Sequence, residues 1–190
     1  MSEIIPDKWT KIKLGKLIEH FQNGYAFTSS RYKNEGIPII SIVNISLDGN
    51  FKFDTTKENK WSREELTFLE KYKVVNGDLI IAMTDVTPTM EILGRGAIVN
   101  RNEVMLLNQR VGLIKTKQDV IKRYLSYLFN SNSWRNYCKT SAGLGAQANL
   151  GTKEILNANI LVPPLPEQKK IVSILTSVDD VIEKTQSQIN

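Results

Sequence analysis

The segment 162–190, VPPLPEQKKIVSILTSVDDVIEKTQSQIN, constrains this chain most, because a proline-rich bend precedes a long unbroken helical pattern. The prolines between 162 and 166 favour an extended, stiff connector, and Pro166 suits the first position of a helix. Aliphatic residues then recur at alternating steps of four and three, the heptad spacing of a coiled-coil seam. The seam comprises Ile171, Leu175, Val178, Ile182, Thr185 and Ile189, and Ile174 and Val181 widen it on one side.

This terminal helix needs a packing partner, since isolated helices gain most of their stability from packing. At about 25 residues it would be about 37 Å long. It could fold back onto the residues before it, or pair with a helix outside this domain. The stiff bend favours pairing, as does the position of Ile189 next to the last residue, with no capping glycine after it. We therefore divide the chain into a globular domain over 1–163 and a coiled-coil helix over 164–190, with the seam as a subunit interface.

Strand and helix patterns are mixed over the region 1–163. Because they do not alternate strictly, they predict an α+β fold, with a twisted mixed or antiparallel sheet and flanking helices. Small residues over 141–151 predict a loop with no regular element, and Asp48-Gly49 predicts a turn. A capping box, Ser62 with Glu65, would begin one of the helices. The predicted strands are 36–45, 74–83, 94–100, 104–115 and 159–163, and the predicted helices are 9–21, 62–72, 119–137 and a short one from Thr152.

Positive charge is distributed unevenly along the chain, whose net charge is +5. Residues 167–190 hold three lysines and four acids, a net charge of −1, so the remaining residues carry +6. Between 110 and 139, seven basic residues accompany a single acid, Asp119. Such a surplus is typical of a surface that binds a polyanion, although an ordinary solvated surface explains the charge equally well.

The residues needed for catalysis are sparse. His20 and Cys138 are the sole histidine and cysteine, and no phosphate-cradling glycine-lysine loop occurs. We therefore expect no catalytic residue, no metal and no cofactor. The longest apolar run, 79–83, is far shorter than the roughly 20 residues of a membrane span. A single cysteine suits a reducing cytoplasm.

A family resemblance is carried mainly by NILVPPLPEQKKIVSILTSVDDVIEKT, residues 159–185. It closely resembles the central conserved region of the specificity (S) subunits of type I restriction–modification systems, in which a strand and a Pro-Pro-Leu bend lead into a spacer helix. The PPLPEQKK element is the most specific part. Weaker similarities follow in the order of the family: WTKIKLGKLIEHFQNGYAF, GIPIISIVNI, GDLIIAM, LLNQRVGLIK and SAGLGAQANLGTKEILNANILVPP.

The resemblance implies a target recognition domain for double-stranded DNA over 1–163 and a spacer helix over 164–190. In the family, two such helices pack antiparallel and hold two recognition domains apart, so that each domain reads one part of a split target. The expected helix length matches one turn of B-DNA, about 34–36 Å. Family members commonly carry two recognition domains and two spacer helices. This chain would thus be half of a longer subunit, or a half-sized subunit that pairs with itself.

The implied partners are the methyltransferase (M) subunits and the restriction/translocase (R) subunit. S-adenosylmethionine, ATP and Mg would be bound by those partners alone. The alternative is a coiled-coil adaptor or decoy that does not read DNA.

Candidate DNA contacts are cations and loop residues, because phosphates attract cations, and base edges bind forked or amide side chains. The loop 84–90 has hydroxyl and carboxyl side chains with no evident packing role, and glycines in 143–149 permit close backbone approach. These loops could equally be a plain surface hairpin and a structural turn. Likewise, Tyr25 could be a core residue and Gln109 could satisfy buried backbone. The candidates are Tyr25, Arg31, Lys33, Thr84, Asp85, Thr87, Thr89, Gln109, Arg110, Arg135, Lys139, Gly143, Gln147 and Asn149.

Overall fold

Buried aliphatic runs form a central antiparallel sheet in the computed structural model, which describes residues 6–143 and 147–189, with only the backbone of Ile189. Alternate residues of β6 point to opposite faces, and all four are fully buried, so both faces of the sheet are covered. The strand order is β2 (Ile18–Asn23), β10 (Val111–Thr116), β6 (Leu79–Ala82) and β8 (Gly96–Ile98).

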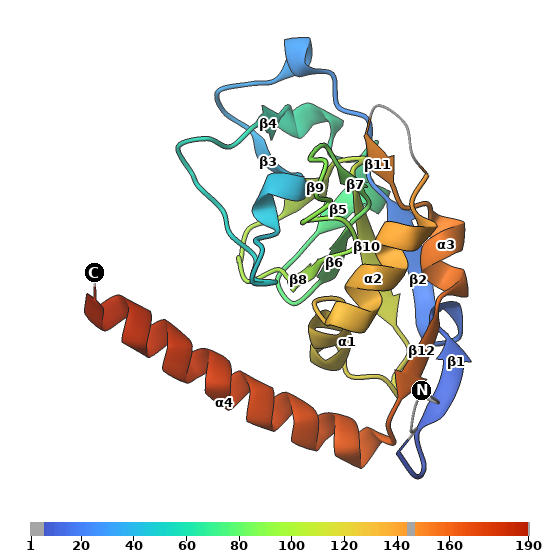
Figure 1. Ribbon diagram of the computed structural model, residues 1–190. Coiled ribbons are helices and arrows are strands. Elements are labelled where there is room, and N and C mark those ends of the chain that lie inside the picture. The colour runs from blue at the N-terminus through green and yellow to red at the C-terminus, as the bar shows by residue number, and fades with distance from the viewer. Residues whose placement is uncertain (1–5, 144–146, 190) are drawn as a thin grey trace.

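Helices cover one face of this sheet (Figure 1). Tyr124, Leu125 and Phe129 pack there with Leu79 and Ile81 of β6. The helices are α1 (Lys122–Leu128) and α2 (Asn132–Ser141), while α3 (Thr152–Asn157) packs against a 3-10 turn at Leu14–Lys16.

A second sheet covers the other face, where Ile80 and Ala82 of β6 meet Met105 and Leu107. Its order is β4 (Lys60–Trp61), β3 (Ile37–Ile40), β9 (Met105–Leu107) and β5 (Lys73–Val74), and β3 runs parallel to β9. Two short pairs complete the fold: β1 (Thr10–Lys13) with β12 (Asn159–Val162), and β7 (Thr84–Asp85) with β11 (Ala148–Asn149). The predicted α+β class with mixed sheets is confirmed.

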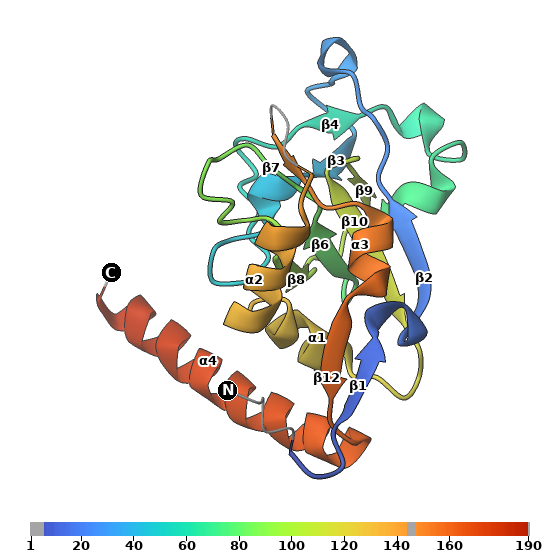
Figure 2. The same cartoon turned by 45° about the vertical axis from the view of Figure 1, so that its right-hand side comes forward.

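The long terminal helix α4 (Leu165–Ile189) follows β12 directly, as the pattern predicted. It leaves the body beside β1 and β12, passes α1, and its C-terminal half extends away from the sheets (Figures 1 and 2). Within the described residues, no helix has the length and apolarity to cross a membrane.

Two predicted helices are wrong. The stretch 9–21 forms β1, a 3-10 turn and the start of β2, because pairing of β1 with β12 and of β2 with β10 overrides the local helical spacing. The stretch 62–72 forms two 3-10 turns, Arg63–Glu65 and Glu70–Tyr72. Glu65 does not complete a capping box, because its carboxylate accepts a hydrogen bond from Trp61 Nε1 at 3.0 Å and pairs with Arg31.

Several boundaries differ from the prediction. The helix expected over 119–137 breaks at Ser131, whose hydroxyl caps α2 by accepting a hydrogen bond from the Trp134 amide at 3.4 Å. The strand expected over 104–115 breaks at the turn 108–110 into β9 and β10. Part of the loop 141–151 does form a strand, β11. The turn at Gly49 is confirmed, with a φ of 80°.

Candidate nucleic-acid interface

Four loops that carry candidate residues meet at one end of the central sheet. Here β2 ends at Asn23, β10 begins at Val111 and β6 ends at Ala82, and these ends are in register. Pairing of β11 with β7, and of Gly143 with Asn149, brings Gly143 and residues 147–149 to the same place. We call this end the distal rim and define it as residues 23–27, 84–90, 108–110, 143 and 147–149. It lies at the opposite end of the body from β1, β12 and the start of α4 (Figure 2).

Backbone hydrogen bonds hold the distal rim together. The Tyr25 amide donates to the Leu107 carbonyl at 2.7 Å, and the Gln109 amide donates to the Tyr25 carbonyl at 2.9 Å. Gly24 permits this approach, since a Cβ there would lie 2.1 Å from the Asn108 carbonyl oxygen. The loops of the rim therefore form one joined surface.

Several polar side chains on this surface are free to bind a ligand. Gln109 and Arg110 are exposed in the turn between β9 and β10, and their side chains bond to no residue that the structure describes. Thr87, Thr89, Gly143 and Asn149 are also exposed. Gln109 is thus a turn residue, which corrects the alternative that it satisfies buried backbone from within a strand.

The structure corrects two of the candidate DNA contacts, Asp85 and Thr84, because both side chains are buried. Asp85 is 1% exposed, and its carboxylate accepts from Thr87 N and Oγ1, both at 2.7 Å, from Ile92 N at 2.7 Å and from Leu93 N at 3.3 Å. Burial acts to raise the pKa of Asp85, but these hydrogen bonds outweigh it and lower that pKa below its ordinary value. Thr84 is buried as well. Asp85 organises the loop, which has the packing role that the sequence did not reveal, and both side chains are buried away from any ligand.

The structure also corrects the expectation that Arg135 contacts a phosphate, because Arg135 is only 6% exposed. Its guanidinium donates to the carbonyl of Leu93 and, at 2.6 Å, to that of Met90. Burial, followed by the nearby charge of Arg95, lowers its pKa. Arg135 therefore ties α2 to the far end of the loop 84–90 and does not reach a phosphate. Asp85 and Arg135 fix the two sides of this loop, and its tip, 86–89, stays exposed.

An aromatic group borders the distal rim at Tyr25. The Tyr25 ring is half-buried, 5.3 Å from Tyr72 and 6.3 Å from Phe68, measured between ring centroids. Phe68 is 71% exposed. Phe68 is not among the candidate DNA contacts, because 62–72 was expected to form a helix. The sequence did contain a signal: Phe68 does not fall on the series Leu66, Leu69 and Tyr72, whose spacing of three would bury one face of the expected helix, so its ring was free to be exposed.

The other cationic candidates are partly engaged. Arg31 pairs with Glu65 and lies over the Trp61 ring, 4.8 Å from its centroid. Lys139 lies 3.5 Å from Glu91, while Lys33 is exposed.

Two rim residues, Gln147 and Thr84, each have a buried side-chain oxygen, Oε1 and Oγ1, with no hydrogen-bond partner among the described residues.

The basic run 110–139 does not form one face. Arg110 lies at the distal rim, whereas Lys117 lies beyond the opposite end of β10. Lys115 pairs with Asp78 at 2.5 Å, Lys122 donates to the Gly77 carbonyl at 2.5 Å, and Arg123 reaches Asp179. Most of this charge stabilises the fold, so the uneven composition did not locate a binding surface.

Most of the predicted seam on α4 is exposed. Exposure is 55% for Ile174, 36% for Leu175, 49% for Val178, 63% for Val181 and 50% for Ile182. Thr185 is exposed too, Ile171 packs partly against the body, and the side chain of Ile189 lies outside the described residues. The helix therefore starts against its own domain but leaves an aliphatic stripe uncovered.

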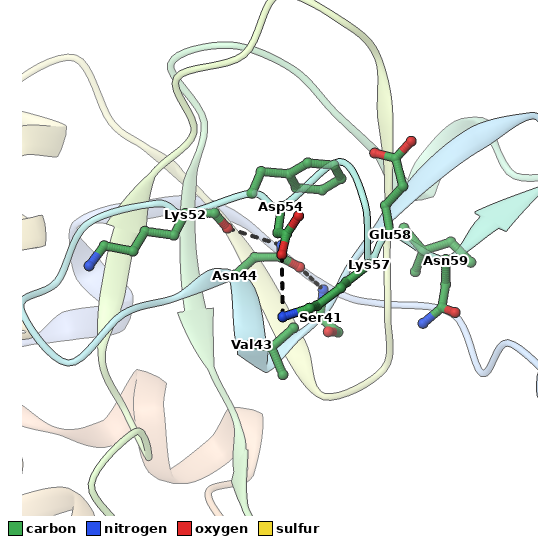
Figure 3. Close-up of a pocket in the computed structure, with 10 residues that line it drawn as sticks. Ser41, Val43, Asn44, Lys52, Asp54, Lys57, Glu58 and Asn59 are labelled. Atoms are coloured by element: carbon green, nitrogen blue, oxygen red, sulfur yellow. Dashed lines mark hydrogen bonds and ion pairs between the residues drawn. The ribbon is translucent and has the colours of Figure 1, made fainter.

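A separate hollow of about 230 Å³ lies beside the connection from β3 to β4 (Figure 3). Asn44 spans it, accepting from the Ser41 amide at 2.8 Å and donating to the Lys52 carbonyl at 3.0 Å. Lys57 and Asp54 pair across its mouth at 3.6 Å. These internal bonds hold the long connection between β3 and β4 in place. Neither this hollow nor any other part of the described residues contains a group of three or more His, Cys, Asp or Glu side chains that could hold a metal ion.

Known proteins are similar to this chain in sequence and in fold. The sequence matches the family described as "Type I restriction modification DNA specificity domain" over residues 6–190. The putative type I restriction enzyme MjaX specificity subunit of Methanocaldococcus jannaschii is 28% identical over 189 residues, covering 97% of this chain and 43% of the relative. The crystal structure of the HsdS subunit from Thermoanaerobacter tengcongensis has a TM-score of 0.65 at 16% identity, covering 98% of this chain and 41% of that one.

Another similar structure is described as showing complex assembly and conformational transition of the type I R-M system. Its TM-score is 0.69 at 16% identity, and the match covers 98% of this chain and 43% of that chain. This chain therefore spans less than half the length of these relatives. Since the family match extends over nearly the whole sequence, the chain belongs to the family of type I restriction–modification DNA specificity domains.

Proposed function

We propose that this chain reads one part of a split DNA target for a type I restriction–modification complex. Its family is described as a DNA specificity domain, and its curated relatives are named specificity subunits. One observation carries the proposal furthest. Exposed Gln109, Arg110 and Asn149 lie at the same end of the central sheet, away from α4, in loops joined through the backbone of Met83.

The chemistry of the distal rim suits a DNA groove. The forked guanidinium of Arg110 fits the O6 and N7 acceptors of guanine or a phosphate, and the amides of Gln109 and Asn149 fit adenine N6 and N7. Thr87 and Thr89 offer hydroxyls to the phosphate backbone, while Gly143 allows a strand to approach closely. Lys33, Arg31 and Lys139 would contact phosphates further out. Gln147 and Tyr25 would support the loops that bear these groups.

The exposed stripe of α4 would pair antiparallel with a second such helix and hold a second recognition domain at a fixed distance. The described helix has 25 residues and so is about 37 Å long, close to one turn of B-DNA. Methyltransferase subunits would dock on the paired helices, and the R subunit would join them. S-adenosylmethionine, ATP and Mg would belong to those partners, so this chain would be a non-catalytic subunit in the cytoplasm.

The test uses the chain assembled with its methyltransferase subunits. Methylated positions on a library of random duplexes, located by sequencing, define the target. Arg110→Ala is compared with Lys117→Ala, a matched exposed cation at the opposite end of β10 whose side chain also bonds to no described residue. Loss of one bidentate contact costs about 1–3 kcal/mol, so Arg110→Ala should lose about fivefold or more in target selectivity. Lys117→Ala should keep the selectivity of the original protein.

An adaptor that does not read DNA gives a different result. In that case the complex assembles, the methylated positions follow no feature assigned by this chain, and the two substitutions have equal effects. That outcome would reject the proposed function.

A further inference from the structure

Helix α4 has one face that contacts its own domain and another that carries the exposed aliphatic stripe. Gln168, Val172, Thr176 and Asp179, at steps of four, four and three, face the body, whereas the exposed stripe lies on another side. At about 100° per residue, the centres of these two faces are about 115° apart around the helix axis. Beyond Ile171, which packs partly against the body, contact with the body and pairing with another helix therefore use different faces of α4.

The first turn of α4 is held by a buried amide. Gln168 is 2% exposed, its Oε1 accepts from the Ile121 amide at 3.0 Å, and its Nε2 donates to the Pro163 carbonyl at 3.0 Å. One side chain thus joins the start of α1, the proline bend and α4. Trp9 Nε1 adds a bond to Glu167 Oε1 at 3.0 Å.

A second attachment lies three turns further along. The Tyr127 hydroxyl of α1 donates to Asp179 Oδ2 at 2.6 Å and lies 3.1 Å from Thr176 Oγ1. Arg123 reaches the same Asp179 oxygen at 3.5 Å and lies over the Tyr127 ring, 5.1 Å from its centroid. We call the group Arg123, Tyr127, Thr176 and Asp179 the α1–α4 latch. Burial and then the bond to Asp179 raise the pKa of Tyr127, so it is a neutral donor at physiological pH.

Two attachments restrict motion in a way that one cannot. Gln168 and Asp179 are eleven residues apart, about 16 Å along the helix, so α4 cannot pivot about the proline bend while both hold. The body is roughly 40 Å across for its length. A tilt of about 5° at α4 would move the distal rim by about 3.4 Å, the rise of one base pair.

We propose that Tyr127 and Asp179, together with Gln168, are positioning residues that set the separation between the two parts of the DNA target. This inference rests on the proposed function. The gap between the two parts of the target would depend on how α4 is attached to its own domain as well as on the length of α4. The latch holds the recognition domain at one angle, so that the gap between half-sites is read to within a base pair.

The first measurement needs no DNA. Spin labels at Lys153→Cys on the body and Ser187→Cys on α4, both exposed positions, report the distance between the two parts in the assembled complex. The native Cys138 is buried and stays unlabelled. Tyr127→Phe and Asp179→Ala should broaden the distance distribution at least about twofold. Tyr137→Phe is the matched control, since its hydroxyl bonds within the body to the Glu154 carbonyl at 2.7 Å, and it should leave the width unchanged.

The second measurement compares methylation of targets whose gap is correct or longer or shorter by one base pair. Tyr127→Phe should reduce discrimination between these gaps about three- to tenfold, and leave the preferred half-site sequence and the thermal unfolding midpoint unchanged. An unchanged distance distribution would overturn the latch, and a broadened distribution with unchanged gap discrimination would overturn its role in spacing. Absence of any sequence preference in the original complex would reject the proposed function, while the distance measurement would still decide the latch.

Discussion

The distal rim and α4 are built alike at their bases and differently at their surfaces. Each base is fixed by buried polar side chains: Asp85 and Arg135 hold the loop 84–90, and Gln168 holds the start of the helix. The rim then exposes amides, hydroxyls and a guanidinium, while α4 exposes aliphatic side chains. The two surfaces therefore suit partners of opposite chemistry, a hydrated polyanion and another apolar helix.

The largest expected effect is on the aliphatic surface. Ile182→Glu places a charge in the seam, which should cost at least about 3 kcal/mol of pairing free energy, or more than 100-fold in affinity. Solution mass with and without the methyltransferase subunit measures it. Lys184→Glu, on the opposite side of the helix, should have little effect. Equal masses for Ile182→Glu and the original chain, at all concentrations, would show that the stripe does not pair.

The next effect is on the base of the rim. Asp85→Ala removes the acceptor for four hydrogen bonds and leaves buried amides of Ile92 and Leu93 unpaired. The free energy of unfolding, from urea denaturation, should fall by about 2–3 kcal/mol. Asp119→Ala, at an exposed position, should stay within about 0.5 kcal/mol. A loss below 1 kcal/mol for Asp85→Ala would mean that the loop is held by other contacts.

A smaller effect is expected beside the rim. Phe68→Ala removes an exposed ring next to Tyr25, and the affinity of the assembled complex for its target should fall by about 1 kcal/mol, roughly fivefold, if the ring stacks on DNA. Val75→Ala, an exposed apolar residue at the other end of the sheet, should leave the affinity unchanged. Equal affinities for both variants and the original protein would exclude Phe68 from the interface.

The smallest effect is a pH dependence. The folded-state pKa of Asp85 is lowered, so its carboxylate contributes stability that is present above its unfolded pKa, about 3.9, and is lost as pH falls through the folded pKa. The difference in unfolding free energy between the original protein and Asp85→Asn should therefore shrink below about pH 4. Urea denaturation at pH 6 and pH 3 measures it, and a constant difference would contradict the assignment.

Residue spacing along the sequence predicted the helices and strands that depend mainly on neighbouring residues. The seam of α4 follows from spacing along one helix, and the strand at β6 from one apolar run. The helix expected over 9–21 failed because β1 and β2 find partners about 150 and 90 residues away, which no local window contains.

The candidate site was predicted at the level of loops and only partly at the level of residues. The predicted loops 84–90 and 143–149 both contribute to the rim, whereas the turn that carries Gln109 and Arg110 was expected to be part of a strand. Asp85 was assigned to DNA because its loop had no evident packing role, and Arg135 because phosphates attract cations, whereas the fold buries both against backbone groups. Their spacing of 50 residues gave no sign that they serve the same loop.

The clamped base of the loop 84–90 has an engineering consequence. Asp85 and Met90 are held from either side, and of the four residues between them Thr87 bonds to Asp85, so Val86, Pro88 and Thr89 are the positions at which this exposed tip can change. Tips of new composition could be grafted between these two points without refolding the body. Retargeting such a domain would then be a matter of exchanging short inserts, with the frame and its helical mount left untouched.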